Sequence, residues 1–331
     1  MDTLILNKTD AVVEYVFYCL PHQPNSCPQI HRCSVVKAGM YIFMLSTILL
    51  TVLGNLLVII SISHFKHLQC PTNFIILSLA LVDCLLGCLI MPFSMVRSVE
   101  GCWFLGDIVC KVHSGLDMSL CMISKMHLCL VSIERYLAIC EPLTYKMTVT
   151  NTNVVVCVSI AWLIPFMYSF GIVFSNVNTL GLDVLMLNSC VGNCALVFNK
   201  QWAVLVSFTN FFIPGAIMSS LYLKIFHVAN KQAKIISDMM AITLNEMKSH
   251  SSEQRERKAA KTLAIVMGAF LICWLPFFIA TITDPFIEFL TPVVVFDALV
   301  WFGYFNSAFN PLIYGFFYPR FRKAFKIILT K

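Results

Sequence analysis

The chain has 331 residues, of which 59% are hydrophobic and only 12% are charged, and its formal net charge is +6. A soluble globular protein carries about 45–50% apolar and about 25% charged residues, so this chain has too few polar side chains to cover a water-facing surface. The composition excludes an ordinary soluble domain and indicates that lipid surrounds much of the chain. Because the positive charge collects in connecting segments, it does not indicate a nucleic-acid partner.

Seven stretches are apolar enough and long enough to cross a bilayer, which takes about 20 residues. In chain order they are 38–62, 72–97, 108–138, 152–175, 201–228, 260–283 and 292–316, with a longer connector at about 229–259. Residues 318–329 then place apolar side chains opposite basic ones at helical spacing, which is typical of a helix lying in the membrane interface. The sequence therefore predicts an all-α membrane protein with an N-terminal segment (1–37), a seven-helix bundle (38–316) and a short amphipathic helix with a tail (317–331).

Lys and Arg are unevenly distributed over the connecting segments. With the N-terminus outside, the cytoplasmic side holds 16 of the 23, dense in 224–261 and 320–331. Because positive charge stays on the cytoplasmic side, we expect the N-terminus to be extracellular. The acceptor Asn7-Lys8-Thr9 then lies outside, where Asn7 can be glycosylated, and seven of the 15 cysteines also fall in outer segments, where disulfides persist.

Each predicted helix carries polar or proline residues that lipid should exclude. They form motifs in chain order: Gly54-Asn55, Leu79-Ala80-Leu81-Val82-Asp83, Glu134-Arg135-Tyr136, Trp162, Pro214 with Tyr222, Cys273-Trp274-Leu275-Pro276 and Asn310-Pro311-Leu312-Ile313-Tyr314. Seven motifs in this order resemble the rhodopsin-like G-protein-coupled receptors over about residues 38–329. The resemblance implies a receptor of the plasma membrane that activates a heterotrimeric G protein.

Within that group the chain looks like a trace-amine-associated receptor. The stretch from Asn306 to Pro311, followed by Tyr314 and by Tyr318-Pro319-Arg320-Phe321, is close to that family's helix-seven signature, although the family has Trp where this chain has Arg320. The resemblance implies a small amine as ligand, a stimulatory G protein with a rise in cyclic AMP, and an olfactory role. The alternative is a receptor of the same fold for a non-amine ligand, or one with weak signalling.

Three other classes of membrane protein are disfavoured. A transporter needs repeats and interrupted helices, and no internal repeat is visible. A retinal-binding protein needs a lysine in its last helix, and no Lys occurs between Asp284 and Pro319. No nucleophile and base occur at matched depth, so the chain is not expected to be an enzyme, and no Cys/His spacing resembles a metal site.

Asp117 is the residue that most strongly indicates a ligand. It lies seven residues after Cys110, two turns down the same helical face, and a carboxylate inside the membrane is costly and indicates function. An ion pair with a basic residue of another helix is the simpler interpretation, but no helical basic residue is obviously available at that depth. An unpaired acid favours a cationic ligand, and in aminergic receptors the matching aspartate binds the ligand's ammonium.

Aromatic residues of helices six and seven and polar residues of helix five are expected to line the same site. They are Trp274, Phe277, Phe278, Trp301, Tyr304, Ser207 and Asn210. Each aromatic taken singly is as readily a core residue, and the resemblance implies that the Tyr304 hydroxyl binds Asp117. Helix five supplies no second acid, and Asp297, two turns above Tyr304, is more simply a solvated acid than a substitute. We therefore expect a monoamine.

Four polar residues at mid-membrane depth suggest a switch: Asp83, Ser124, Ser307 and Asn310. The resemblance implies that they coordinate an allosteric sodium ion that stabilises the inactive state, and polar packing is the alternative. No other cofactor is expected. At the cytoplasmic end, Glu256 is placed to pair with Arg135, and Tyr222 and Tyr314 are expected to restack on activation, with the basic residues Arg255, Arg257, Lys258 and Lys261 facing the G protein or anionic lipid.

The resemblance also implies two disulfides, one between Cys110 and Cys194 and one between Cys190 and an N-terminal cysteine. Cys27 is favoured for the second, with Cys19 and Cys33 as competitors.

Lys125 has no counterpart in the pattern, because related receptors carry an apolar residue at this position. A lysine at the bilayer centre should be neutral, snorkelling or paired. Asp83 is the nearest acid in depth, but Lys125 points about 80° around from the face of Asp117 and Ser124. The hypothesis is that its stem bends back to pair with Asp83, which would replace the sodium ion and alter signalling; the alternative is that Lys125 is merely tolerated.

Overall fold

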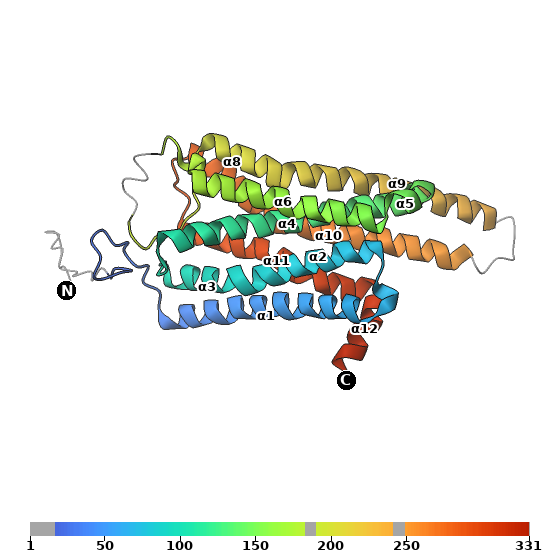
Figure 1. The fold of residues 1–331 in the computed structure, drawn as a ribbon, viewed down its shortest axis with the longest axis horizontal. Coiled ribbons are helices and arrows are strands. Elements are labelled where there is room, and N and C mark those ends of the chain that lie inside the picture. Colours follow the sequence, from blue (N-terminus) through green and yellow to red (C-terminus); the bar gives the residue numbers. More distant parts are fainter. Residues whose placement is uncertain (1–16, 183–189, 241–248, 331) are drawn as a thin grey trace.

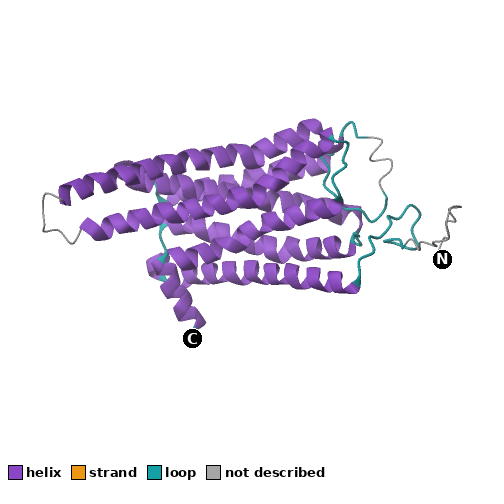
Figure 2. Cartoon of the chain, turned by 180° about the vertical axis from the view of Figure 1, so that it is seen from behind, coloured by secondary structure: helices purple, strands orange, loops and turns teal. Residues whose placement is uncertain are grey.

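The computed structural model describes residues 17–182, 190–240 and 249–330, and the side chains of 17–231, 265–316 and 318–330 within these ranges. Long helices run side by side along the length of the molecule, and loops join them at its two ends (Figure 1, Figure 2). Within the described residues, six helical segments are long and apolar enough to cross a membrane. The seventh span is α11 (Val293–Phe317), which carries Asp297, Asn306 and Asn310 among its apolar residues.

The first helices match the spans predicted from the sequence. Helix α1 (Ser34–His64) is followed by a continuous second span made of α2 (Pro71–Leu85), the π-helical turn η2 (Leu86–Ile90) and α3 (Met91–Glu100). Helix α4 (Gly106–Cys140) packs against α2, α6 (Asn151–Ser175) and α9 (Ile213–Met240), so it lies at the centre of the bundle. A short helix, α5 (Pro142–Thr148), lies between α4 and α6.

The fifth and sixth helices are longer than predicted. The fifth span consists of α8 (Lys200–Ser207), the π-helical turn η4 (Phe208–Phe212) and α9 (Ile213–Met240), and α10 covers Ser249–Thr283. The predicted connector at 229–259 was therefore too long, and both helices project beyond the rest of the bundle (Figure 1). The membrane surface does not end a helix whose sequence continues with good helix formers such as Ala, Lys and Gln.

Helix α12 (Pro319–Leu329) follows α11 and turns away from the bundle axis (Figure 1). Its Phe321 and Ala324 are buried, and the Phe321 ring lies 5.8 Å from the ring of Tyr314 on α11. The intervening basic residues are exposed. The seven-helix bundle and the amphipathic eighth helix predicted from the sequence are thus confirmed.

Three disulfides close the end of the bundle that is opposite α12, called here the disulfide end. They are Cys110–Cys194, Cys27–Cys190 and Cys19–Cys102. The first two are the expected pairs. The third was missed, because Cys19 was considered only as a competitor for Cys190, and the segment after α3 that carries Cys102 was not considered as its partner.

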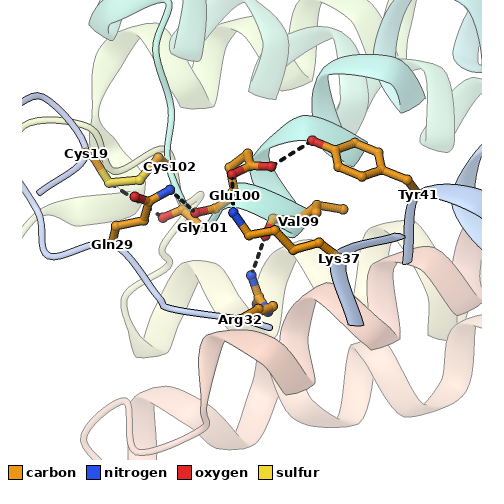
Figure 3. Close-up of polar contacts among 9 residues, drawn as sticks. All are labelled: Cys19, Gln29, Arg32, Lys37, Tyr41, Val99, Glu100, Gly101 and Cys102. Carbon is orange, nitrogen blue, oxygen red and sulfur yellow. Dashed lines mark hydrogen bonds and ion pairs between the residues drawn. A yellow bond between two sulfur atoms is a disulfide. The ribbon is translucent and has the colours of Figure 1, made fainter. Parts of the chain in front are cut away.

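The N-terminal segment is also attached to α3 by polar contacts (Figure 3). The Lys37 ammonium lies 2.6 Å from Glu100 Oε2, and the Tyr41 hydroxyl donates to Glu100 Oε1 at 2.9 Å. The Arg32 guanidinium donates to the Val99 carbonyl at 2.8 Å. Arg32 and the Cys19–Cys102 disulfide thus attach the N-terminal segment to the end of the second span, and Lys37 and Tyr41 join the start of α1 to the same end.

Candidate ligand-binding site

Asp117 lies on α4 and is half-buried. The Tyr304 hydroxyl of α11 donates a hydrogen bond to its Oδ2 at 2.9 Å, which is the contact implied by the family resemblance. The Cys121 thiol, one turn along α4, lies 3.5 Å from its Oδ1. A carboxylate has about four acceptor positions, so these two contacts orient Asp117 and leave acceptor capacity for a cation.

Tyr304 is fully buried and is itself held in place. Its hydroxyl lies 3.4 Å from Ser94 Oγ on α3, and Ser94 lies 3.3 Å from His113 Nε2. His113 lies one turn before Asp117 on α4, so it belongs to the same helical face. Sequence reasoning missed Ser94 and His113, although the four-residue spacing from Asp117 was a usable signal for the histidine.

The aromatic residues of α10 form one cluster. The Trp274 ring lies 5.8 Å from Phe277 and 5.9 Å from Phe278, and Phe278 lies 5.1 Å from Phe211 in η4. Phe211 was not predicted as part of the site. The π-helical turn shifts the helical register at this point, so period-3.6 reasoning could not assign its direction.

The polar side chains of helix five are turned onto their own helix. The Ser207 hydroxyl donates to the Ala203 carbonyl at 2.7 Å, and the Asn210 amide donates to the Val206 carbonyl at 2.9 Å. Trp301 donates to Ser98 Oγ at 3.3 Å, and its ring lies 5.6 Å from that of Tyr304. These contacts do not test a role of Ser207, Asn210 or Trp301 in binding a ligand, which stays a prediction.

Lys125 does not pair with Asp83, and this prediction was wrong. Its ammonium lies 3.7 Å from the centroid of the Trp274 ring and 4.9 Å from that of Phe278. Long side chains on a helix point toward the N-terminus of that helix. Lys125 also lies about 100° around α4 from its neighbour Ser124, which is the residue that reaches Asp83.

Asp83 is fully buried and is the acceptor of three hydrogen bonds. Ser124 and Ser307 donate to Oδ1 at 2.9 and 2.8 Å, and Asn310 donates to Oδ2 at 2.7 Å. The four residues suggested by the sequence therefore converge from α2, α4 and α11. The buried Asn306 Oδ1, adjacent to Ser307 in the chain, has no hydrogen-bond partner within the part of the chain that the structure describes.

At the opposite end of α4, Arg135 pairs with its neighbour. Its Nε lies 2.6 Å from Glu134 Oε2, and Glu134 also accepts hydrogen bonds from Thr72 and Tyr145 at 2.7 and 2.9 Å. Burial and the negative charge of Glu134 raise the pKa of Tyr145, which keeps its hydroxyl a donor. The predicted partner Glu256 and its basic neighbours Arg255, Arg257, Lys258 and Lys261 lie outside the described side chains, and Asn7 lies outside the described residues.

The two tyrosines of the predicted switch lie apart in different clusters. Tyr314 is buried, and its ring lies 5.9 Å from that of Tyr318. Tyr222 packs beside Ile225 on α9, with its ring 6.2 Å from Phe226. Their restacking on activation stays a prediction.

Comparison with known proteins places this geometry in a family. Residues 54–314 match the model of the 7 transmembrane receptor (rhodopsin family). The chain is 51% identical to trace amine-associated receptor 4 of Rattus norvegicus over 316 residues, which cover 95% of this chain and 91% of that protein. It is 48% identical to trace amine-associated receptor 1 of Homo sapiens (92% and 91% covered) and 46% identical to trace amine-associated receptor 2 of Homo sapiens (95% and 88% covered).

Proposed function

This chain belongs to the trace-amine-associated receptors within the rhodopsin family of seven-transmembrane receptors, and from that premise we propose that its ligand is a small monoamine whose ammonium binds Asp117. It is a multi-pass membrane protein and a signalling receptor, not an enzyme. The observation that carries the proposal is the carboxylate of Asp117, which is half-buried among the helices and bound only by a hydroxyl and a thiol in the described part of the chain.

A single acid in this position supports a monoamine rather than a diamine. Helix five from Lys200 to Phe212 contains no Asp or Glu. Asp297 lies seven residues before Tyr304, about 10 Å along α11 at 1.5 Å per residue. The ammonium would bind Asp117 by charge and hydrogen bonds, and the aromatic rings of Trp274, Phe277 and Phe278 would pack against the rest of the ligand.

The output is proposed to be a stimulatory G protein, with a rise in cyclic AMP and an olfactory role. The pair between Arg135 and Glu134 holds the arginine against α4. In the proposal, agonist binding shifts the population toward a form in which the expected pair between Glu256 of helix six and Arg135 is broken. Arg135 and Tyr222 then face the G protein. The Asp117 end of the bundle faces outward from the plasma membrane, which is supported by the three disulfides at that end.

A sodium ion is proposed as an allosteric ligand of the cluster around Asp83. Hard cations take oxygen ligands, and the cluster offers the carboxylate of Asp83 and the hydroxyls of Ser124 and Ser307, all buried. The residues present therefore fit the ion. Asp83, Ser124 and Ser307 would hold it, with the Asn310 amide carbonyl beside them, and its positive charge would stabilise the inactive arrangement.

The experiment that tests the proposed function is a panel of small amines applied to cells that express the chain with a cyclic-nucleotide reporter. We expect at least one monoamine to raise cyclic AMP in a dose-dependent way, and cells without the chain to remain silent. A panel in which no amine activates a receptor that reaches the surface would overturn the proposal and favour a non-amine ligand or weak signalling.

A further inference from the structure

Lys125 is a buried cation that pairs with no anion among the described side chains. Its side chain is 3% exposed in the middle of α4. Among the side chains that the structure describes, the two ion pairs are Lys37–Glu100 and Arg135–Glu134, and no hydrogen bond joins Lys125 to a neighbour. Its ammonium instead lies on the faces of Trp274 and Phe278. A cation–π contact is favourable, but a buried charge also needs a counter-charge and hydrogen bonds.

Neither of the two acids in this part of the bundle forms an ion pair with Lys125 among the described side chains. Asp83 is engaged by three donors from Ser124, Ser307 and Asn310. Asp117 is oriented by Tyr304 and Cys121, and its remaining acceptor capacity is the proposed ammonium site. Lys125 is therefore an available positive charge in the middle of α4, about two helical turns deeper in the bundle than Asp117.

Asp117, Cys121 and Lys125 follow one another at four-residue spacing, so an acid, a thiol and an ammonium lie along one ridge of α4. About 12 Å of helix axis separates Asp117 from Lys125. Because a lysine stem on a helix points toward the helix N-terminus, the ammonium lies closer to Asp117 than its Cα does. One small molecule can span the distance between the two charges.

We propose that the ligand is a zwitterion, an amine that also carries an anionic group, whose ammonium binds Asp117 and whose anionic group binds the Lys125 ammonium. This rests on the proposed function, since it takes Asp117 as the ammonium site, and it adds the ligand class. A plain aromatic amine would place its apolar end against a buried charge. A ligand carboxylate beside Lys125 would supply the missing counter-charge and draw the Lys125 ammonium away from the Trp274 ring. Ligand binding would therefore leave the Trp274 indole freer to move.

The test compares two ligands that differ in one group, phenethylamine and the same amine with a carboxylate in the para position of its ring, extended to aliphatic amines and their ω-amino-acid counterparts. The receptors are the wild type, Lys125→Met, which keeps length but removes charge, and Lys125→Arg, which keeps charge. Surface level is measured for each with an epitope tag. We expect the wild type and Lys125→Arg to prefer a carboxylate-bearing ligand, by roughly 30-fold or more in EC50 for the wild type. In Lys125→Met that preference should disappear or reverse.

The result that overturns the inference is a wild type for which no carboxylate-bearing ligand exceeds its parent amine, or a preference that Lys125→Met leaves unchanged. Chloride is the competing anion, so the assay is repeated with gluconate in its place. A plain amine that matches the zwitterion in chloride and weakens in gluconate would make Lys125 a chloride site and sink the proposal. Asp117→Asn separates the zwitterion proposal from the proposed ammonium site. If the amine responses need Asp117 but show no carboxylate preference, only the zwitterion proposal is refuted. If the responses do not depend on Asp117, the ammonium site itself is refuted.

Discussion

Asp117→Asn is the substitution that isolates the charge of the proposed ammonium site. Asn has nearly the same shape as Asp, and its amide oxygen can still accept the hydrogen bond that Tyr304 donates at 2.9 Å. The change therefore removes the charge while the local packing is kept. Removing one partner of a buried charge pair costs about 3–5 kcal/mol. Because Asp117 is half-buried rather than fully buried, we expect the lower end, about 3 kcal/mol or roughly a hundredfold in potency.

The assay is an amine dose–response with a cyclic-nucleotide reporter, normalised to the surface level of each receptor. Asp107→Asn is the matched control, because Asp107 is an exposed acid in the first turn of the same helix, and its loss should leave the EC50 unchanged. An unchanged amine EC50 in an Asp117→Asn receptor that reaches the surface would refute the assignment of Asp117 as the ammonium site.

Three further predictions concern the sodium site, the unexpected disulfide and the arginine pair. Asp83→Asn should make agonist affinity equal in sodium and in N-methylglucamine buffers, whereas the wild type should bind agonist more weakly in sodium; a variant that keeps the difference contradicts the site. Cys19→Ser should lower stability by about 2–5 kcal/mol, measured as a reduced melting temperature in detergent, and Cys102→Ser should add nothing to it, since the two share one bridge. Glu134→Gln should raise basal cyclic AMP, because it removes the charge that holds Arg135, while Glu141→Gln, at an exposed acid nearby, should not.

The helical framework could be predicted from the sequence because, in a bilayer, the position of each helix is marked along the chain by a long apolar stretch. Length and hydropathy identify a spanning helix, and the amphipathic period identifies α12. What the sequence did not indicate was how far a helix continues outside lipid, since there no change in hydropathy marks its end. Helices α9 and α10 differ from their predicted ends for this reason.

Contacts between buried side chains could be predicted from the sequence where the side chains are short. Asp83 meets Ser124, Ser307 and Asn310 because short polar groups at one depth can only reach one another. Lys125 was mispredicted because its direction depends on helix rotation and on a long flexible stem. Phe211 was missed because a π-helical turn changes the register locally.

Gly303 gives a prediction about the packing that surrounds this site. It precedes Tyr304 on α11, and a Cβ added to it would lie 2.7–2.9 Å from three ring atoms of Trp274. The indole, which is 5% exposed and carries Lys125 on its face, thus packs directly against the α11 backbone.

Gly303→Ala should therefore displace Trp274 or separate α10 from α11, and overpacking of this kind costs about 1–3 kcal/mol. The better helix propensity of Ala returns at most about 1 kcal/mol, so we expect a lower melting temperature and a changed basal cyclic AMP level. Gly171→Ala on α6, where an added Cβ meets nothing within 4 Å, gains the propensity without the clash and should be neutral or slightly stabilised. If the two alanine variants melt and signal alike, Trp274 is not held against α11 in the way that gives Lys125 its aromatic contact.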